Sequence, residues 1–197
     1  MSVLLAQGKT ARVAAAIEER LRRVFPAAVF HHAILPAKLS PAVWNDLVRG
    51  TPFVGIGWSG NEASGTVPRE WQGRISFQIS LVTQNERGIR ERYFGDRFAP
   101  GIFAMADAAT VALNGATVAG IGTLFVPRVA DAFVDGWGDN MAIAVVHVVV
   151  TTPITVRETL DGPEICADDL REVVWNWIVG PDLDVQTIMI DQTEKIA

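Results

Sequence analysis

Two segments of the chain repeat their apolar residues every three or four positions, as helices with one buried stripe do. In residues 11–24 the stripe consists of Val13, Ile17, Leu21 and Val24. In residues 100–113 it consists of Ile102, Ala106, Ala109 and Leu113. In the first segment, two glutamates each precede an arginine by four positions, a spacing that forms exposed ion pairs. The pattern predicts two amphipathic helices, ended by Pro26 and Gly115.

Other segments alternate apolar and polar residues. A period of two is typical of a strand with one buried and one solvent-exposed face. The alternation is clearest in residues 74–83, and the apolar residues 53–58 predict a second, buried strand. The polar sequence between them, NEASGTVPREWQG, predicts a long loop. A short helix is expected from Ser40-Pro41, a cap followed by proline at the first helical position, to Gly50.

Residues 123–134 and 141–152 flank a turn rich in aspartate, glycine and asparagine, which predicts an antiparallel hairpin. Pro127 lies inside the first strand and cannot donate a backbone hydrogen bond, so this strand is expected at an edge of the sheet or with a bulge. The second strand is apolar on both faces and is expected to be central.

This order of elements predicts an α+β fold, an antiparallel (mixed) β-sheet with the two main helices packed on one face. We expect a core domain, residues 1–156, and a C-terminal extension, residues 157–197. The extension has a polar linker, a short helix at residues 168–179 and an extended segment. It is either an arm that packs on a neighbouring subunit or a sheath-type protein, or extra packing against its own domain; the sequence leaves both open.

Composition narrows the function classes. The net charge of −5 and the pI near 5.2 argue against sequence-specific nucleic-acid binding, which needs a basic surface. One cysteine, Cys166, and three histidines are too few for a disulfide framework or a structural zinc site, and they indicate a reducing compartment. No signal peptide is predicted. The longest apolar run, residues 141–150, is too short to cross a membrane.

The sequence FVGIGWSG, residues 53–60, contains the pattern G-x-G-x-x-G of dinucleotide-binding loops. Such a loop must lead into a helix, whose free N–H groups hold the phosphates. The next eight residues have no helical periodicity and end in Pro68. The glycines are therefore expected to serve the backbone of a strand, and no cofactor is predicted. Ser59 is not a nucleophile elbow either, because position 61 is asparagine.

The remaining polar candidates have simple structural explanations. His31 and His32 are adjacent, so on a strand they point to opposite faces and cannot easily share a metal ion. His147, in an apolar strand, is expected to be a hydrogen-bonded core residue. Aspartates of the hairpin are interpreted as turn residues and match no calcium loop; they are Asp131, Asp135 and Asp139. No metal or catalytic residue is predicted.

Tryptophans are the remaining candidates for a functional surface. Five of the six lie in or beside predicted loops or in the C-terminal helix, where the ring either packs in its own domain or anchors a partner. The candidate interface residues are Trp58, Trp71, Trp137, Trp175 and Trp177.

The order and local character of these elements resemble the tail terminator proteins of tailed bacteriophages, in particular the Mu-like small tail proteins. The matching stretches are ARVAAAIEERLRRVF, PFVGIGWSG, REWQGRISFQISLVTQNERG, APGIFAMADAATVALNG and FVPRVADAFVDGWGDNMAIAVVHVVVTT. The resemblance covers residues 10–156 and has no counterpart for the extension. It implies a non-enzymatic virion protein, assembled in the host cytoplasm, that forms a hexameric ring. Such a ring caps the tail tube and contacts the tube protein, a head-side connector or stopper protein and a sheath protein, while DNA passes through without specific binding.

Two other functions stay open at this level. One is another tail or neck structural protein, such as a tail tube or tail completion protein. The other is a small-molecule enzyme that binds a nucleotide at the glycine-containing stretch.

Overall fold

A computed structural model describes residues 8–36, 40–67, 70–132 and 140–155. The predicted C-terminal extension and the turn at 133–139 lie outside these residues. The described helices are α2 (Lys9–Val24), α3 (Pro41–Leu47), α4 (Ile89–Phe94) and α5 (Ile102–Leu113), with a 3-10 turn, η1 (Val48–Gly50). The strands are β1 (His31–Leu35), β2 (Phe53–Val67), β3 (Glu70–Gln84), β4 (Thr117–Val118), β5 (Gly122–Thr123), β6 (Phe125–Asp131) and β7 (Met141–Thr155). No described helix is long and apolar enough to span a bilayer.

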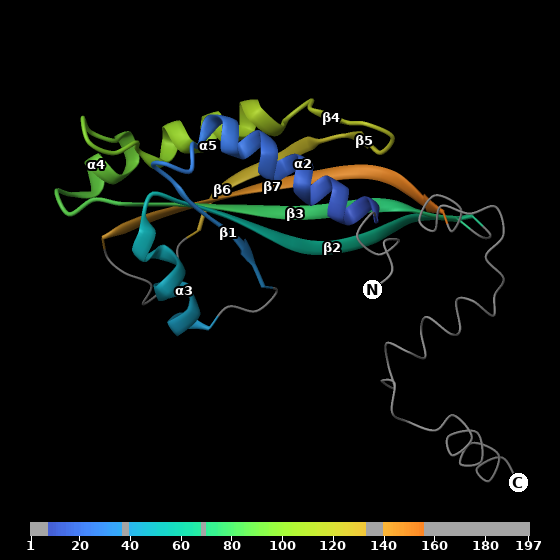
Figure 1. Ribbon diagram of the computed structural model, residues 1–197, viewed down its shortest axis with the longest axis horizontal. Helices are drawn as coiled ribbons and strands as arrows, with labels where there is room; N and C mark the ends of the chain where they lie inside the picture. Colours follow the sequence, from blue (N-terminus) through green and yellow to red (C-terminus); the bar gives the residue numbers. More distant parts are fainter. Residues whose placement is uncertain (1–7, 37–39, 68–69, 133–139, 156–197) are drawn as a thin grey trace, which may run out of the picture. The chain divides into compact units, whose positions relative to one another are not determined.

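Five strands form one sheet in the order β1-β2-β3-β7-β6. The pair of β1 with β2 is parallel, and the other neighbouring pairs are antiparallel, so the sheet is mixed. The main helices α2 and α5 lie next to each other over the sheet (Figure 1). The predicted α+β class, with a mixed sheet and two main helices on one face, is confirmed.

The helix-covered face holds the larger core. Alternate residues of the strands point into it because successive side chains of a strand face opposite sides. From α2 it takes Val13, Ile17 and Leu21, and from β3 it takes Ile75, Phe77, Ile79 and Leu81, all 3% exposed or less. The predicted stripe on the first helix ends differently, because Phe25 is buried while Val24 is 40% exposed.

A smaller core lies on the opposite face, at one end of the sheet. Its buried residues are Leu35, Trp44, Val48, Phe53, Val82 and Ile143. The Trp44 and Phe53 rings meet edge to face, with centroids 6.2 Å apart. The short helix that brings Trp44 here begins as the sequence predicts, since Ser40 Oγ accepts a hydrogen bond from the Val43 backbone N–H.

The central strands are longer than predicted. In the expected loop NEASGTVPREWQG, residues 61–67 and 70–73 instead form the paired ends of β2 and β3, and each of these strands has 15 residues. Its polar composition reflects exposure, because the side chains of Glu62, Ala63 and Ser64 face solvent rather than a core. A polar stretch in the sequence therefore indicates solvent-exposed side chains. It does not by itself indicate an irregular backbone.

The hairpin prediction is confirmed in its strands. β7 lies between β3 and β6, as its apolar sequence predicted, and β6 is an edge strand. The register shifts between Phe125 and Arg128, on either side of Pro127, which is the bulge that the proline predicted.

Candidate assembly interface

Beyond α3, no described helix covers the face of the sheet that points away from α2 and α5. We call the part of this face on β3, β7 and β6 the open face. Its residues are Ser76, Gln78, Ser80, Phe125, Arg128, Ala130, Val145, His147 and Val149. The strand register places His147 between Gln78 on one side and Arg128 on the other.

The open face divides into a polar and an apolar part. On β3 it presents two serines and a glutamine, whereas β6 and β7 present Phe125, Ala130, Val145 and Val149. Phe125 lies directly opposite Val149 and is 57% exposed, and the other three are half-buried. We call these four residues the apolar patch. Apolar side chains grouped on one exposed face indicate a surface that another molecule covers.

His147 is placed differently from its prediction. It is a half-buried residue of the open face, while its neighbours Val146 and Val148 are buried in the larger core. The sequence does not show this alternation, because valines occupy both the core-facing and the open-face positions of β7 around His147.

The edge of the sheet beside β2 is partly uncovered. β1 pairs only with the first five residues of β2, from Phe53 to Gly57, so the rest of β2 has no described strand on that side. Trp58 begins this uncovered edge and is 53% exposed, and its indole N–H donates to Asn61 Oδ1 at 3.1 Å. A strand edge with an exposed aromatic ring is suited to pairing with a partner strand.

The structure does not gather the predicted tryptophans into one site. Trp58 lies opposite Phe77, whereas Trp71 lies opposite Thr66 and is half-buried, with its ring packed over Gly73. Six positions along β3 separate Phe77 from Trp71, which is roughly 20 Å of strand. Trp137, Trp175 and Trp177 lie outside the described residues. The role of the five as interface residues stays a prediction.

The glycines of FVGIGWSG lie inside β2, and no helix follows them. Gly55 is close-packed, since a Cβ there would lie 2.6 Å from Leu35 Cδ1 and 2.8 Å from Phe53 Cε1. Gly60 has a φ of 131° at a register shift, a conformation that favours glycine. The interpretation of these glycines as strand backbone agrees with this geometry, and the helix N-terminus that a phosphate site needs is not there.

Two glycine substitutions are expected to differ although they lie two residues apart. Gly55→Ala should lower the free energy of unfolding by about 1–2 kcal/mol, because Leu35 and Phe53 must shift to admit the methyl group. Gly57→Ala should change it by less than about 0.5 kcal/mol, because its Cβ would meet only ordinary contacts at 3.6 and 3.7 Å. Urea unfolding of both variants measures the difference. Equal costs would contradict the packing argument.

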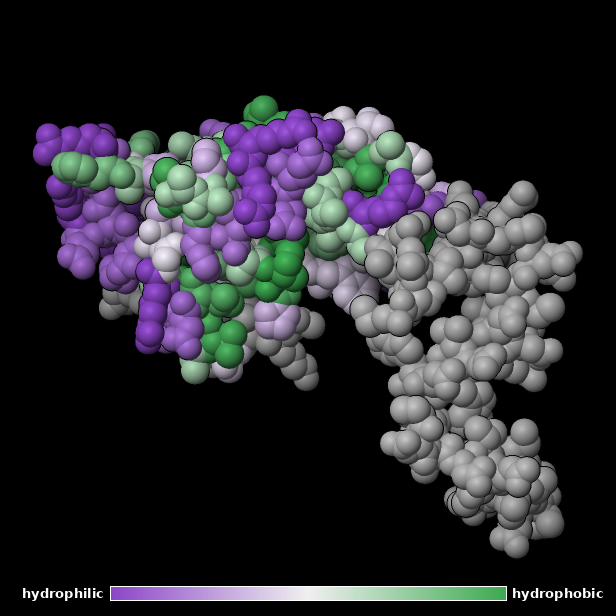
Figure 2. All heavy atoms as spheres, viewed as in Figure 1, coloured by the Kyte–Doolittle hydropathy of each residue, from purple (hydrophilic) through white to green (hydrophobic). Residues whose placement is uncertain are grey.

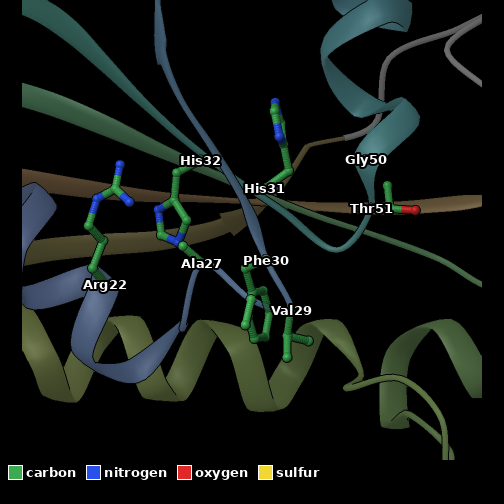
Figure 3. Close-up of a pocket in the computed structure, with 9 residues that line it drawn as sticks. Arg22, Ala27, Val29, Phe30, His31, His32, Gly50 and Thr51 are labelled. Carbon is green, nitrogen blue, oxygen red and sulfur yellow. The ribbon is translucent and has the colours of Figure 1, made fainter.

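The two adjacent histidines separate as expected. His31 stacks on Phe53, with ring centroids 5.7 Å apart, and His32 Nε2 donates to the Phe25 carbonyl oxygen at 2.7 Å. Both line an open hollow with Arg22 and Gly50, in which the two rings point in different directions (Figure 3). Within the described residues, no three His, Cys, Asp or Glu side chains gather in a way that would hold a metal ion.

A second exposed surface lies at the end of β3, around α4, which the sequence did not predict. Two rings there are exposed, Phe94 at 65% and Phe98 at 66%. The guanidinium groups of Arg87 and Arg97 lie 4.9 and 4.4 Å from the Phe98 ring centroid, and that of Arg90 lies 5.1 Å from the Phe94 centroid. We call these five residues the Arg/Phe cluster. Figure 2 shows hydrophilic and hydrophobic atoms intermixed at this end of the sheet.

Hydrogen bonds fix the loop that carries the cluster. Asp96 accepts from the backbone N–H groups of Phe98 and Ala99 at 2.8 and 3.0 Å, and from Asn85 Nδ2 at 3.1 Å. These bonds, that of Phe98 first, lower the pKa of the Asp96 carboxyl, so it is ionised at neutral pH and pairs with Arg87 at 3.2 Å. The cluster is thus presented on an ordered loop.

The hairpin aspartate that the structure describes has a structural partner. Asp131 accepts a hydrogen bond from the Tyr93 hydroxyl at 2.8 Å. This bond, with burial and the negative charge of Asp131, raises the pKa of the Tyr93 phenol. The pair ties β6 to α4 beside a small apolar hollow at Phe103. Asp135 and Asp139 lie outside the described residues.

Comparison with known proteins identifies a similar fold. No protein-family model and no curated protein sequence matches the chain. Among solved structures, a chain of the virion of a native gene transfer agent (GTA) particle is similar, with 16% sequence identity, a TM-score of 0.44, and coverage of 78% of this chain and 100% of that chain. The chain is structurally similar to a virion protein. A second solved protein, named without a function, matches with 16% identity, a TM-score of 0.42, and coverage of 72% and 93%.

At this identity the likeness concerns the fold alone. No family and no role is assigned to the chain from it. The virion assembly, its stoichiometry and its partners are therefore proposals.

Proposed function

We propose that this protein is a structural subunit of a virion that closes into a ring with its own copies. The ring caps the tail tube, ends tube polymerisation and joins the tail to a head-side connector or stopper protein. A hexamer is the expected size, with the tube protein and a sheath protein as further neighbours. The protein has no enzymatic role in this proposal.

The observation that carries the proposal is the apolar patch of the open face. Phe125 and Val149 lie opposite each other on a sheet face that the described helices leave bare. A monomer would keep these side chains in water, whereas a neighbouring subunit would remove them from it and gain the free energy of their burial. Assembly through this face is thus favourable for the same reason that the core is stable.

Ring closure needs two different surfaces on each subunit. A contact between unlike surfaces is heterologous, and it forms a closed ring when the rotation between neighbours closes the circle. The chain presents such unlike surfaces, namely the open face with its apolar patch and the uncovered edge of β2 with Trp58. These features support a ring over a two-fold dimer, in which one surface meets its own copy.

The size of the purified full-length protein tests the proposal. We expect light scattering to give about six times the subunit mass of 21.3 kDa, and negative-stain images to show single rings. Rings that stack into long tubes would favour the alternative of a tail tube subunit. A monomer at all accessible concentrations would contradict a self-assembling ring.

A further inference from the structure

Charge is divided unevenly along the chain. Residues 156–197 contain ten acidic and three basic residues, a net charge of −7. The total is −5, so the preceding 155 residues carry a net charge of +2. The acidic character of the protein therefore comes from its C-terminal segment. That segment also contains large apolar residues, among them Trp175 and Trp177.

The Arg/Phe cluster has the complementary composition. Between residues 85 and 99 the chain has four arginines and three acidic residues, and one of the acidic residues, Asp96, is engaged with Arg87 and the loop backbone. Arg90 and Arg97 form no ion pair with a carboxylate of the described residues. The cluster thus offers cations over exposed aromatic rings, a surface that suits an acidic segment with apolar side chains.

The strand directions separate the cluster from Thr155, the last described residue of the same copy. Met141 of β7 pairs with Gln84, next to the cluster, and Thr155 pairs with Glu70 at the other end of β3. Fourteen steps along the strand place these ends roughly 45 Å apart. Thr155, the last described residue before the acidic segment, therefore lies at the end of the sheet far from the cluster of its own copy, and a head-to-tail neighbour can bring another cluster next to it.

We propose that the acidic C-terminal segment of one subunit binds the Arg/Phe cluster of the neighbouring subunit and so links consecutive copies of the ring. The proposal rests on the proposed function, since it assumes repeated head-to-tail contacts. Its chemistry is charge pairing of Asp and Glu with Arg90 and Arg97, together with apolar contact on the rings of Phe94 and Phe98. One such contact per subunit adds to the contacts of the open face.

The single cysteine, Cys166, lies in the acidic segment and provides a test in the full-length chain. A second cysteine is introduced beside the cluster by Ile89→Cys, a residue 69% exposed. The matched control is Val111→Cys, which is 82% exposed towards the other end of α5. Both variants, and the unaltered chain, are treated with a short bismaleimide, and the products are separated on a denaturing gel.

We expect a ladder of covalent oligomers from Ile89→Cys, several-fold stronger than from Val111→Cys or the unaltered chain. Adding Arg90→Glu and Arg97→Glu should remove the ladder, because the reversed charges repel the acidic segment. Cross-linked monomer alone would show that the segment binds its own cluster, and equal ladders from both cysteine variants would show no preference for it. Either outcome overturns the inference.

Light scattering on the same samples separates the two proposals. Rings of unchanged size in a sample without the expected ladder would leave the proposed function intact and remove only the role of the acidic segment. A monomeric unaltered chain would remove the ring itself.

Discussion

Phe125→Glu is expected to convert the ring into monomers without unfolding the subunit. In the monomer this side chain is 57% exposed on an edge strand, so glutamate there remains in water and costs the fold little. In the assembly the same carboxylate is moved out of water and against an apolar neighbour, which costs several kcal/mol at every contact. Light scattering should give the mass of one chain, 21.3 kDa, as the main species.

The matched control is Val111→Glu. Val111 is 82% exposed on α5, on the helix side of the sheet and away from the open face. This variant should assemble as the unaltered chain does, with a similar melting temperature. If Phe125→Glu also kept the full ring, the open face would not be the contact between subunits.

Gly101→Ala should have the largest effect on the stability of the subunit. A Cβ on Gly101 would lie 2.2 Å from the backbone nitrogen of Gly95 and 2.4 Å from the carbonyl oxygen of Tyr93. These are backbone atoms, so the clash cannot be relieved by a change of side-chain rotamer. The backbone at the end of α4 must move away from the start of α5. We expect a loss of about 3 kcal/mol in the free energy of unfolding, measured by urea denaturation.

The control for this variant is Gly57→Ala, which adds the same methyl group where only ordinary contacts surround it. A comparable cost at both positions would indicate a general effect of replacing glycine, and would contradict the close approach of α4 to α5. Because α4 carries Phe94 and the loop of Phe98, Gly101→Ala should also weaken the cross-linking of Ile89→Cys described above.

The sequence predicted the elements whose period is set by one buried face. α2 and α5 each pack one stripe on the sheet, so their apolar residues recur at helical spacing. β3 alternates because one of its faces meets the core and the other is open. Pro127 marked the edge strand and its bulge because proline lacks the N–H that a central position requires.

Elements without a buried face were not predicted. The ends of β2 and β3 are held by the pairing of their backbones, and Glu62, Ala63 and Ser64 are successive exposed residues that show no apolar alternation. α4 has six residues and none of them is buried, so it leaves no apolar stripe. Its position is fixed instead by the hydrogen bond of Asp96 with Asn85 and by the contact of Phe94 with Phe103 of α5, which join residues nine to eleven positions apart.

The tryptophans show what the sequence leaves open about a surface. Trp58 is exposed on β2, and its role at an interface stays a prediction, whereas Trp44, for which no interface role was predicted, is a core residue of α3. The Arg/Phe cluster was missed although its sequence, RGIRERYFGDRF, places arginines beside aromatic residues. Only the folded loop brings Arg87 and Arg97 to the same ring, ten residues apart in the chain.

β3 pairs with β7 along all 15 of its residues, and on the other side with β2 from Glu70 to Val82. A strand held in this way does not hinge, so the two borders of the sheet keep a constant angle, set by the twist of roughly 20–25° between neighbouring strands. For a subunit that meets its neighbours through opposite borders, such a rigid sheet keeps the two contact surfaces in one fixed relation. Successive copies would then be related by the same rotation.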